Sequence, residues 1–273
     1  MKRIVMFFSL LSMIALAAPL ASASQTEVII NGSTTVLPVM QRAGEAFMNA
    51  NPDVTLAISG GGSGNGIRAL NEGLCHVAMS SRDIRATELE QGQNRGVNAV
   101  KIPVAIDALV PIVHPDNPVQ NLTKEQLRDI YAGKITNWKS VGGRDENIVV
   151  VTRDTASGTF ETWQDIIMAQ EKVFPRALLQ ASNGSVVQVV TGNRRALGYI
   201  GFGYLNDRVK KLNVNGIEAT PASAVAGEWP IARELYVFTN GAPEGAVKRL
   251  IDFVLDPQKG QKAVAEIGFI PLQ

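Results

Sequence analysis

The stretch from Arg153 to Thr159 combines one permanent cation, three hydroxyl groups and small residues, just before a segment with helical periodicity. Apolar residues follow at Phe160, Trp163 and Ile167, and Ser157 stands where the N-cap of a helix is expected. Amides in the first turn of a helix have no intrahelical acceptor, and the helix dipole favours negative charge there. A guanidinium offers a planar fork of donors that suits a tetrahedral oxyanion. The heptapeptide therefore indicates a cradle for a small anion, or else an ordinary capped helix beside a surface arginine.

Three further turns place hydroxyl groups between a short apolar run and a segment with helical spacing. They are Ser33-Thr34-Thr35, the glycine-rich stretch 59–66 that contains Ser63, and Ser80-Ser81-Arg82. Glycines allow backbone amides to approach a ligand closely. Because each turn independently offers donors to an anion, the four clusters together favour an anion site more strongly than any one of them does.

The glycine-rich stretch lacks the signature of a nucleotide site. A P-loop requires Gly-Lys-Ser/Thr, whereas here Gly66 is followed by Ile67 and Arg68. A dinucleotide fingerprint requires a third glycine, and that position falls on Asn65 or Ile67 in the two available registers. A flexible surface turn remains the alternative interpretation of this stretch.

Strand patterns alternate with helical patterns along the chain, which predicts an α/β fold with mostly parallel sheets. Ligands of such sheets bind beyond the carboxyl ends of strands, where the four polar clusters are expected. The apolar run 100–113 contains Pro103, Asp107 and Pro111, which argues against one central strand and favours a pair of strands. With a return near 231–239, this crossing predicts two lobes that close over a small ligand and exclude water.

The N-terminus has the pattern of a secretory signal peptide. Met1-Lys2-Arg3 precedes an apolar run from Ile4 to Leu20 and the small residues Ala21-Ser22-Ala23. No cysteine follows this run, so we expect no lipid anchor. The prediction is an exported, soluble mature chain that begins near Ser24, after cleavage near Ala23.

The composition excludes several function classes. Without the signal peptide the chain has 24 basic residues against 25 acidic ones, so nothing indicates nucleic acid or an anionic membrane surface. Cys75 is the only cysteine, which excludes an internal disulfide and a thiolate metal site. We expect no metal ion and no cofactor.

The polar clusters, in their order along the chain, resemble the phosphate-binding proteins of high-affinity phosphate ABC importers, the PstS type. The resemblance rests on Gly32-Ser33-Thr34-Thr35, Gly62-Ser63-Gly64, Ser80-Ser81-Arg82 and Arg153-x-x-x-Ser157-Gly158-Thr159. It extends to Ile135-Thr136-Asn137-Trp138 with Gly142-Gly143 and to Gly198-Tyr199-Ile200, and so covers essentially the whole mature chain.

The resemblance implies a type II periplasmic binding protein with two lobes, a hinge, and mixed, mostly parallel sheets flanked by helices. We expect lobe I to comprise residues 24–105 and 233–273, and lobe II residues 106–232. The resemblance also implies a periplasmic location, no catalysis, and delivery of inorganic phosphate to an inner-membrane permease powered by a cytoplasmic ATPase. A monomer is expected of a carrier that must dock and leave.

Carried over by position, the resemblance implies that loop amides, hydroxyls and an arginine hold the ligand. The expected ligand-binding residues are Ser33, Thr34, Thr35, Ser63, Ser81, Arg82, Arg153, Ser157, Gly158 and Thr159. One position departs from the family pattern, because Ser81 stands where better-known members have an aspartate. That aspartate accepts the proton of hydrogen phosphate and repels sulfate, so Asp83 or Asp154 is the candidate acceptor here.

Two other functions stay open. The same fold and permease could serve another oxyanion, such as sulfate, molybdate or a phosphonate. A hydrolase with Ser157 as nucleophile needs a base, and the chain offers only His76 and His114, both expected to be structural. The nucleophile-elbow pattern Gly-x-Ser-x-Gly is also absent around Ser157.

Overall fold

The computed structural model of the protein describes residues 25–272, so the expected signal peptide lies outside the described residues. The strands are β1 (Thr26–Gly32), β2 (Val54–Gly60), β3 (Val77–Ser80), β4 (Ala99–Val113), β5 (Asn121–Leu122), β6 (Val149–Arg153), β7 (Leu178–Gln180), β8 (Ala196–Gly201), β9 (Lys210–Lys211), β10 (Asn213–Val214) and β11 (Ala232–Asn240). The helices are α1 (Leu37–Ala50), α2 (Ser63–Asn71), α3 (Ala86–Gln93), α4 (Lys124–Tyr131), α5 (Gly158–Ile166), α6 (Asn183–Gly192), α7 (Pro221–Val225), α8 (Gly245–Leu255) and α9 (Gly260–Glu266). Within this part of the chain, no helix has the length and apolar character needed to span a bilayer.

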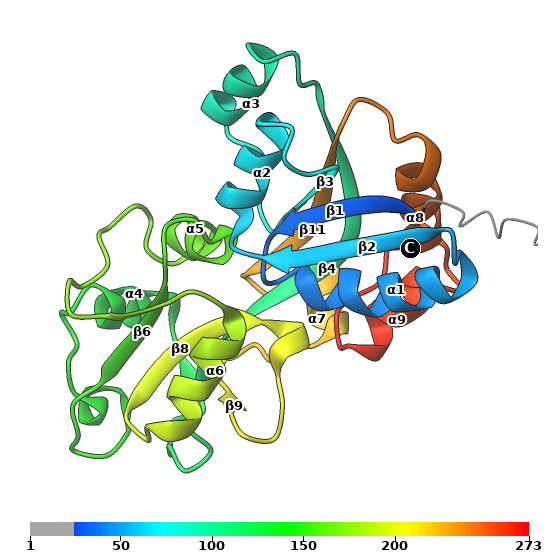
Figure 1. Ribbon diagram of the computed structural model, residues 1–273. Helices are drawn as coiled ribbons and strands as arrows, with labels where there is room; N and C mark the ends of the chain where they lie inside the picture. The colour runs from blue at the N-terminus through cyan, green and yellow to red at the C-terminus, as the bar shows by residue number, and fades with distance from the viewer. Residues whose placement is uncertain (1–24, 273) are drawn as a thin grey trace, which may run out of the picture.

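One mixed sheet runs through both halves of the molecule, in the strand order β2-β1-β3-β11-β4-β8-β6-β7. Strand β1 is parallel to β2 and β3, and β6 is parallel to β7 and β8. The long strands β4 and β11 run antiparallel to each other and to their neighbours β8 and β3. Figure 1 shows β4 running from one lobe into the other, with β11 beside its first part and helices on the outer faces. The predicted α/β fold with flanking helices is confirmed, and its antiparallel pairings are concentrated at the crossing.

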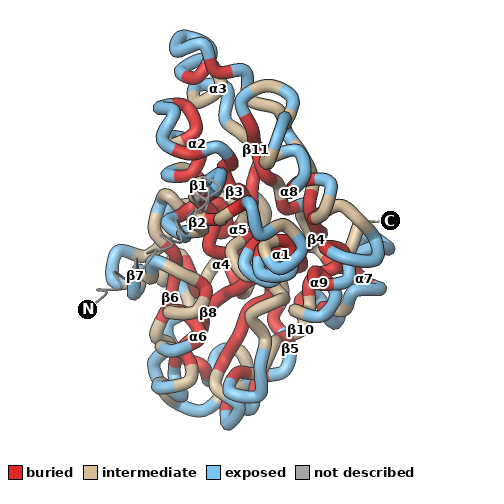
Figure 2. Tube along the Cα trace, turned by 45° about the vertical axis from the view of Figure 1, so that its right-hand side comes forward, coloured by how far each residue is buried: buried red, intermediate tan, exposed pale blue. Residues whose placement is uncertain are grey.

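Separate hydrophobic cores underlie the two lobes. One joins residues of β1 and β3 to α1, α8 and α9, and the other joins residues of β8 to α4, α5 and α6. In β1, Val28 and Ile30 belong to the core under α1, whereas Ile29 packs against a smaller cluster with Leu70 of α2, so helices cover both sheet faces. Figure 2 shows buried strands inside and exposed helix surfaces outside. The expected lobe boundaries remain a prediction.

The expectation that residues 100–113 form two strands is wrong, because β4 is a single strand of 15 residues. Pro103 lies opposite Tyr236 beside a β-bulge, where the ladder is already interrupted. Pro111 turns its backbone toward Leu212, whose amide donates to its carbonyl, so the ladder with β8 needs no donor from Pro111. The run nevertheless crosses between the lobes, as the sequence predicts.

A close backbone approach at the end of β1 brings two of the polar turns together. Gly32 has a φ of +136°, and a Cβ there would lie 2.2 Å from the carbonyl oxygen of Met79 in β3. The amide of Ser33 donates to the same carbonyl at 2.8 Å. Only glycine fits this conformation and this contact. The turn after β1 is thereby fixed beside the turn after β3.

We expect Gly32→Ala to lower the free energy of unfolding more than Gly73→Ala does. Gly73 also has a positive φ, +69°, but a Cβ there would meet no atom within 4 Å. The control therefore reports only the conformational cost, about 1 to 2 kcal/mol, whereas at Gly32 the backbone of β3 must also move. Urea denaturation of both variants measures the difference, and equal losses would contradict the argument.

Candidate functional site

Five hydroxyl side chains from four loops meet at the carboxyl ends of the parallel strands, and we name them the hydroxyl cluster. Its members are Thr34 and Thr35 after β1, Ser63 at the start of α2, Ser81 after β3 and Thr159 in the first turn of α5. The Oγ1 atoms of Thr35 and Thr159 are 2.9 Å apart, and the Oγ atoms of Ser63 and Ser81 are 3.3 Å apart. Each member is at most 8% exposed. The structure thus brings together residues that lie more than a hundred positions apart in the chain.

The N-terminus of α5 lies against the hydroxyl cluster. Ser157 caps this helix as predicted, since its Oγ accepts the amide of Phe160 at 3.2 Å. A Cβ on Gly158 would come within 2.5 and 2.7 Å of the two serine hydroxyls of the cluster. Ser33 has a comparable local part, because its Oγ accepts the amide of Thr35 at 3.1 Å. First-turn amides without an intrahelical acceptor therefore lie beside the hydroxyls, at the positive end of the helix dipole.

Arg153, at the end of β6, is a buried cation whose hydrogen-bond partners are all neutral. It is 1% exposed, and its guanidinium donates to the carbonyls of Gln180 and Ala181 and to Oγ1 of Thr34, at 3.0, 3.0 and 3.3 Å. Its Nη1 is buried and has no hydrogen-bond partner among residues 25–272. Burial lowers the pKa of Arg153, and the nearby charge of Arg233 acts in the same direction. A buried cation with a spare donor is a place where an anion is strongly stabilised.

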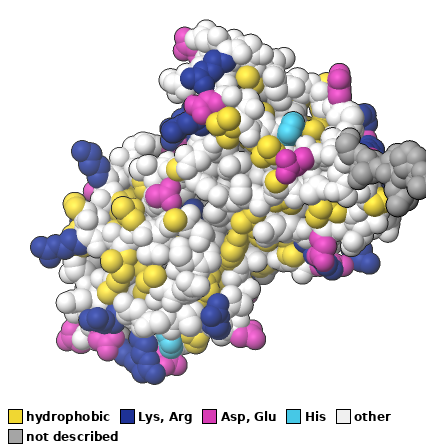
Figure 3. All heavy atoms as spheres, in the orientation of Figure 1, with side chains coloured by type: hydrophobic (Ala, Val, Ile, Leu, Met, Phe, Trp, Pro, Cys, Tyr) yellow, Lys and Arg dark blue, Asp and Glu magenta, His cyan; other side chains and the backbone are white. Residues whose placement is uncertain are grey.

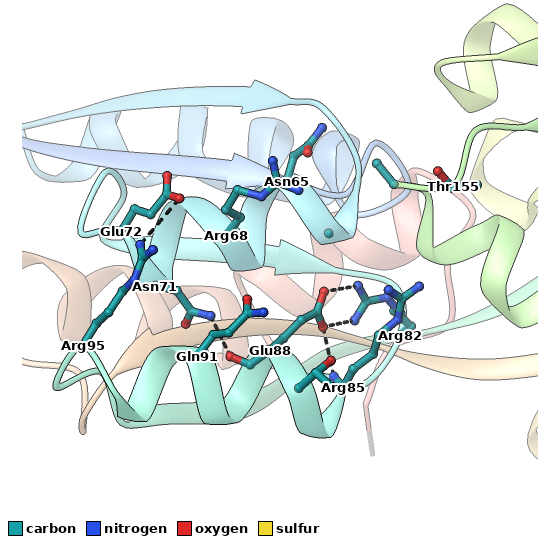
Figure 4. Close-up of a pocket in the computed structure, with 13 residues that line it drawn as sticks. Asn65, Arg68, Asn71, Glu72, Arg82, Arg85, Glu88, Gln91, Arg95 and Thr155 are labelled. Carbon is teal, nitrogen blue, oxygen red and sulfur yellow. Dashed lines mark hydrogen bonds and ion pairs between the residues drawn. The ribbon is translucent and has the colours of Figure 1, made fainter.

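Arg82 departs from the expectation of a ligand contact, because its guanidinium already pairs with two glutamates. Its Nη2 lies 2.7 Å from the carboxylate of Glu88, and its Nε lies 2.6 Å from that of Glu161. Figure 4 shows Arg82 and Glu88 facing each other beside α2 and α3. Since Glu161 belongs to α5, in the other lobe, Arg82 bridges the lobes at the rim of the hydroxyl cluster. Its charge is balanced by protein groups, unlike that of Arg153.

Two residues that sequence reasoning missed contact the threonines after β1. The Nδ2 of Asn183, at the start of α6, donates to Oγ1 of Thr35 at 3.0 Å. The hydroxyl of Tyr204 donates to the carbonyl of Thr34, and burial raises the pKa of Tyr204 to about 12, so it remains a donor. Asn183 could have been found, because it opens a helix after a predicted turn, as the assigned clusters do.

A buried ion pair on the crossing strands was also missed. Arg233 of β11 lies opposite Asp107 of β4 in the ladder, and its Nη2 is 2.9 Å from that carboxylate. The same Nη2 donates to Oγ1 of Thr159 at 2.9 Å. The available signal was an acidic residue within one apolar crossing segment and a basic residue within the other.

Most of the cluster's hydroxyl oxygens accept a hydrogen bond from a nitrogen that can only donate. The donor–acceptor pairs are Arg153 Nη2 with Thr34, Asn183 Nδ2 with Thr35, the Ser81 amide with Ser63, and Arg233 Nη2 with Thr159. The amide of Asn183 is fixed in this orientation because its Oδ1 accepts the backbone amide of Gly201. Each of these hydroxyls can therefore donate its own hydrogen, and within the Thr35–Thr159 and Ser63–Ser81 pairs one hydrogen lies between the two oxygens. The cluster therefore presents donors, as a site for an oxyanion requires.

Both aspartates considered as acceptors of the ligand's proton already have a hydrogen-bond or ion-pair partner in the protein. The carboxylate of Asp83 is 57% exposed and pairs with Lys101 at 2.7 Å. The carboxylate of Asp154 accepts the amide of Ala156 at 2.9 Å, within its own turn. The hydroxyl of Ser81 bonds to another hydroxyl and can either donate or accept. Among the cluster's oxygens, that of Ser81 accepts from no nitrogen of the described residues, so it is best placed to accept a hydrogen bond from a protonated oxyanion.

Comparison with known sequences identifies the family to which this chain belongs. A family model described as the PBP superfamily domain matches residues 17–258. The chain is 32% identical over 248 residues to the phosphate-binding protein PstS of Bacillus subtilis, which covers 89% of this chain and 80% of that protein. It is 31% identical over 287 residues to the phosphate-binding protein PstS of Borreliella burgdorferi, with both chains fully covered.

Solved structures show the same fold over nearly all of the chain. One is a crystal structure, with bound phosphate, of a substrate-binding protein assigned to a phosphate ABC transporter of Clostridium perfringens. The TM-score is 0.85 at 37% identity, with 91% of this chain and 100% of that one covered. An ABC-type phosphate transport receptor from Vibrio cholerae gives a TM-score of 0.73 at 32% identity, with 90% and 100% covered.

The ion pair between Arg82 and Glu88, at the rim of the hydroxyl cluster, makes the free energy of unfolding depend on pH in the acid range. Burial raises the pKa of Glu88, but hydrogen bonds and the charge of Arg82 outweigh burial and hold it below the ordinary value of 4.5. A carboxyl group with a lowered folded-state pKa contributes stability above its unfolded-state value and loses it as the pH falls through the folded-state value. We therefore expect Glu88→Gln to lower the free energy of unfolding at neutral pH. The difference from wild type should shrink toward pH ~3.

Urea denaturation at the two pH values tests this expectation, with Glu266→Gln as the control. Glu266 pairs with Arg42 at 3.1 Å on the surface, where an ion pair contributes little. A difference between Glu88→Gln and wild type that stays constant with pH would contradict the argument.

Proposed function

Since the chain belongs to the PBP superfamily, and within it to the PstS-type phosphate-binding proteins, we propose that it binds inorganic phosphate between its lobes. The proposed ligand groups are the hydroxyl cluster, the first-turn amides of α5 at Gly158 and Thr159, and Arg153. Ser33 and Ser157 act on these groups by capping the local turns. Arg82 bridges the lobes at the rim, so we assign it to closure and leave it out of direct ligand contact.

The unbalanced charge of Arg153 is the observation that carries this proposal. Arg82 and Arg233 each have a carboxylate partner within 3 Å, whereas the partners of Arg153 are two carbonyls and a hydroxyl. Desolvating a cation without an opposite charge is expensive. A phosphate dianion that accepts from the free Nη1 would supply that charge, while the oriented hydroxyls would donate to its other oxygens.

Delivery to an ABC importer completes the proposed role. The two lobes meet around the cluster through direct contacts, such as the amide of Gly64 on the carbonyl of Ala156 at 3.0 Å. Closure of this kind excludes water and strengthens hydrogen bonds to a trapped ion. We propose that the mature chain works as a periplasmic monomer and hands phosphate to an inner-membrane permease. In the view of Figure 3, acidic and basic side chains are interspersed, in keeping with a carrier whose partner is not a polyanion.

A non-catalytic role agrees with the surroundings of Ser157. Its Oγ caps α5, while the Nδ1 atoms of His76 and His114 accept the backbone amides of Ile29 and Asp116. Each histidine is thus engaged locally, and neither hydrogen-bonds to Ser157 within the described chain. A serine hydrolase would need such a base.

Loss of Arg153 should abolish most of the affinity for phosphate. Truncating a buried charge partner typically costs about 2 to 5 kcal/mol, so Arg153→Ala should weaken binding by that amount in isothermal titration of ligand-stripped mature protein. Arg144→Ala is the control, because Arg144 is exposed in the loop before β6. Equal affinities of the two variants would remove Arg153 from the site. Absence of any heat with wild type at neutral pH would overturn the phosphate proposal itself.

Sulfate could compete with phosphate, because the neutral side chain of Ser81 does not repel it. A hydroxyl can accept a hydrogen bond from the protonated oxygen of hydrogen phosphate, but it does not repel a fully ionised oxyanion. We expect Ser81→Asp to weaken sulfate binding much more than phosphate binding, while Ser81→Asn, its uncharged counterpart, should not separate the two ions in this way. Competition titrations with both anions measure the ratio of dissociation constants. A ratio that is the same in both variants would contradict a role of Ser81 in selectivity.

A further inference from the structure

The Asp107–Arg233 pair is the one buried ion pair at the centre of the crossing strands. The side chain of Asp107 is fully buried and that of Arg233 is 8% exposed. Buried ion pairs are weak sources of stability, because desolvation offsets their attraction. This pair is therefore a candidate for a functional role, and Arg233 contacts Thr159 of the hydroxyl cluster directly.

The guanidinium of Arg233 is aimed by Asp107. Both Nε and Nη2 donate to the same carboxylate oxygen, at 3.1 and 2.9 Å. The other oxygen of Asp107 accepts the amide of Phe202 at 2.9 Å, which anchors the carboxylate from the end of β8. Two fixed bonds to one oxygen leave the planar guanidinium little freedom to turn.

The remaining donors of Arg233 hold both sides of the candidate site. Nη1 donates to the carbonyl of Ser81 at 2.9 Å, to that of Gly158 at 3.2 Å and to the hydroxyl of Thr162 at 3.1 Å. Nη2 donates to Oγ1 of Thr159 at 2.9 Å. The loop after β3 and the first turn of α5 are thus tied to one side chain. Burial lowers the pKa of Arg233, and the charge of Asp107 opposes this, so the guanidinium remains protonated at neutral pH.

The hydrogen bond from Arg233 to Thr159 determines whether the Thr159 hydroxyl donates or accepts toward a ligand. Because Nη2 of Arg233 can only donate, it occupies an acceptor position on Thr159, so the hydroxyl hydrogen can be donated to Oγ1 of Thr35, 2.9 Å away, or to a ligand. We propose that Arg233, aimed by Asp107, is a positioning residue that makes Thr159 and the start of α5 donate to the bound oxyanion. This inference rests on the proposed phosphate binding and assigns a part in it to two residues that do not touch the ligand.

The test is a double-mutant cycle on phosphate affinity, measured by titration of ligand-stripped mature protein. One arm is the pair variant Asp107→Asn/Arg233→Met, which removes both charges together, leaves no unpaired buried ion and keeps the net charge. The other arm is Thr159→Val, and the third protein combines all three substitutions. We expect the pair variant and Thr159→Val each to raise the dissociation constant by about 10- to 100-fold, the effect of losing a charge-assisted hydrogen bond. The combined protein should bind little worse than either arm.

Two results would overturn the proposal: a pair variant that binds like wild type, or effects that simply multiply in the combined protein. Multiplication would mean that the pair does not act through Thr159, as expected of a merely structural pair. The control is Asp53→Asn/Arg249→Met, an Asp–Arg pair at 2.6 Å on the surface, which should leave affinity unchanged. If wild type itself does not bind phosphate, the proposed function fails, and that outcome is distinct from failure of the cycle.

A second variant covers the case in which the pair variant does not fold. Arg233→Lys keeps the charge beside Asp107 but lacks the planar fork that reaches Thr159, Gly158 and Ser81 together. We expect the ligand-free melting temperature to stay near that of wild type while the dissociation constant rises about tenfold or more. Unchanged affinity in a folded Arg233→Lys protein would overturn the inference.

Discussion

The structure depends on a positive charge that the protein buries and leaves unbalanced. Arg153 is 1% exposed, its partners are neutral, and one of its nitrogens has no partner within the described chain. Such a group destabilises the ligand-free folded protein, because its charge is desolvated, and it stabilises the complex with an anion. The surrounding hydroxyls follow the same logic, since Thr34, Thr35 and Thr159 each accept a hydrogen bond from a side-chain nitrogen and keep a hydrogen to donate.

The same strand arrangement, repeated in each lobe, brings these donors together. In each lobe parallel strands end at a common edge, so loops that are distant in sequence open onto the same point. The strands β4 and β11 cross between the lobes and turn these two edges toward each other. Gly32 and Gly158 then permit contacts that a side chain would block, against β3 and against the serines of the cluster.

The sequence was sufficient for the local parts of the site and for the fold class. Ser157 as a cap, the loops with Ser63 and Ser81, and Arg153 after a strand all follow from short-range rules of helix starts and strand ends. Long-range partners were out of reach, because pairing between Asp107 and Arg233 depends on register between strands more than a hundred residues apart. The ion pairs of Arg82 were out of reach for the same reason, since nothing local to it indicates that Glu161 pairs with it. Pro103 misled the strand assignment because the bulge beside it, between the pairs Leu235–Ala105 and Tyr236–Pro103, is set by the register with β11 and cannot be read from the sequence of β4 alone.

The most direct test of the central claim is a crystal structure of the mature protein with phosphate bound. We expect a phosphate oxygen within hydrogen-bond distance of Nη1 of Arg153, with Thr35, Ser63 and Thr159 donating to the other oxygens. A phosphate found elsewhere, or an Arg153 that faces a protein carboxylate in the complex, would contradict it.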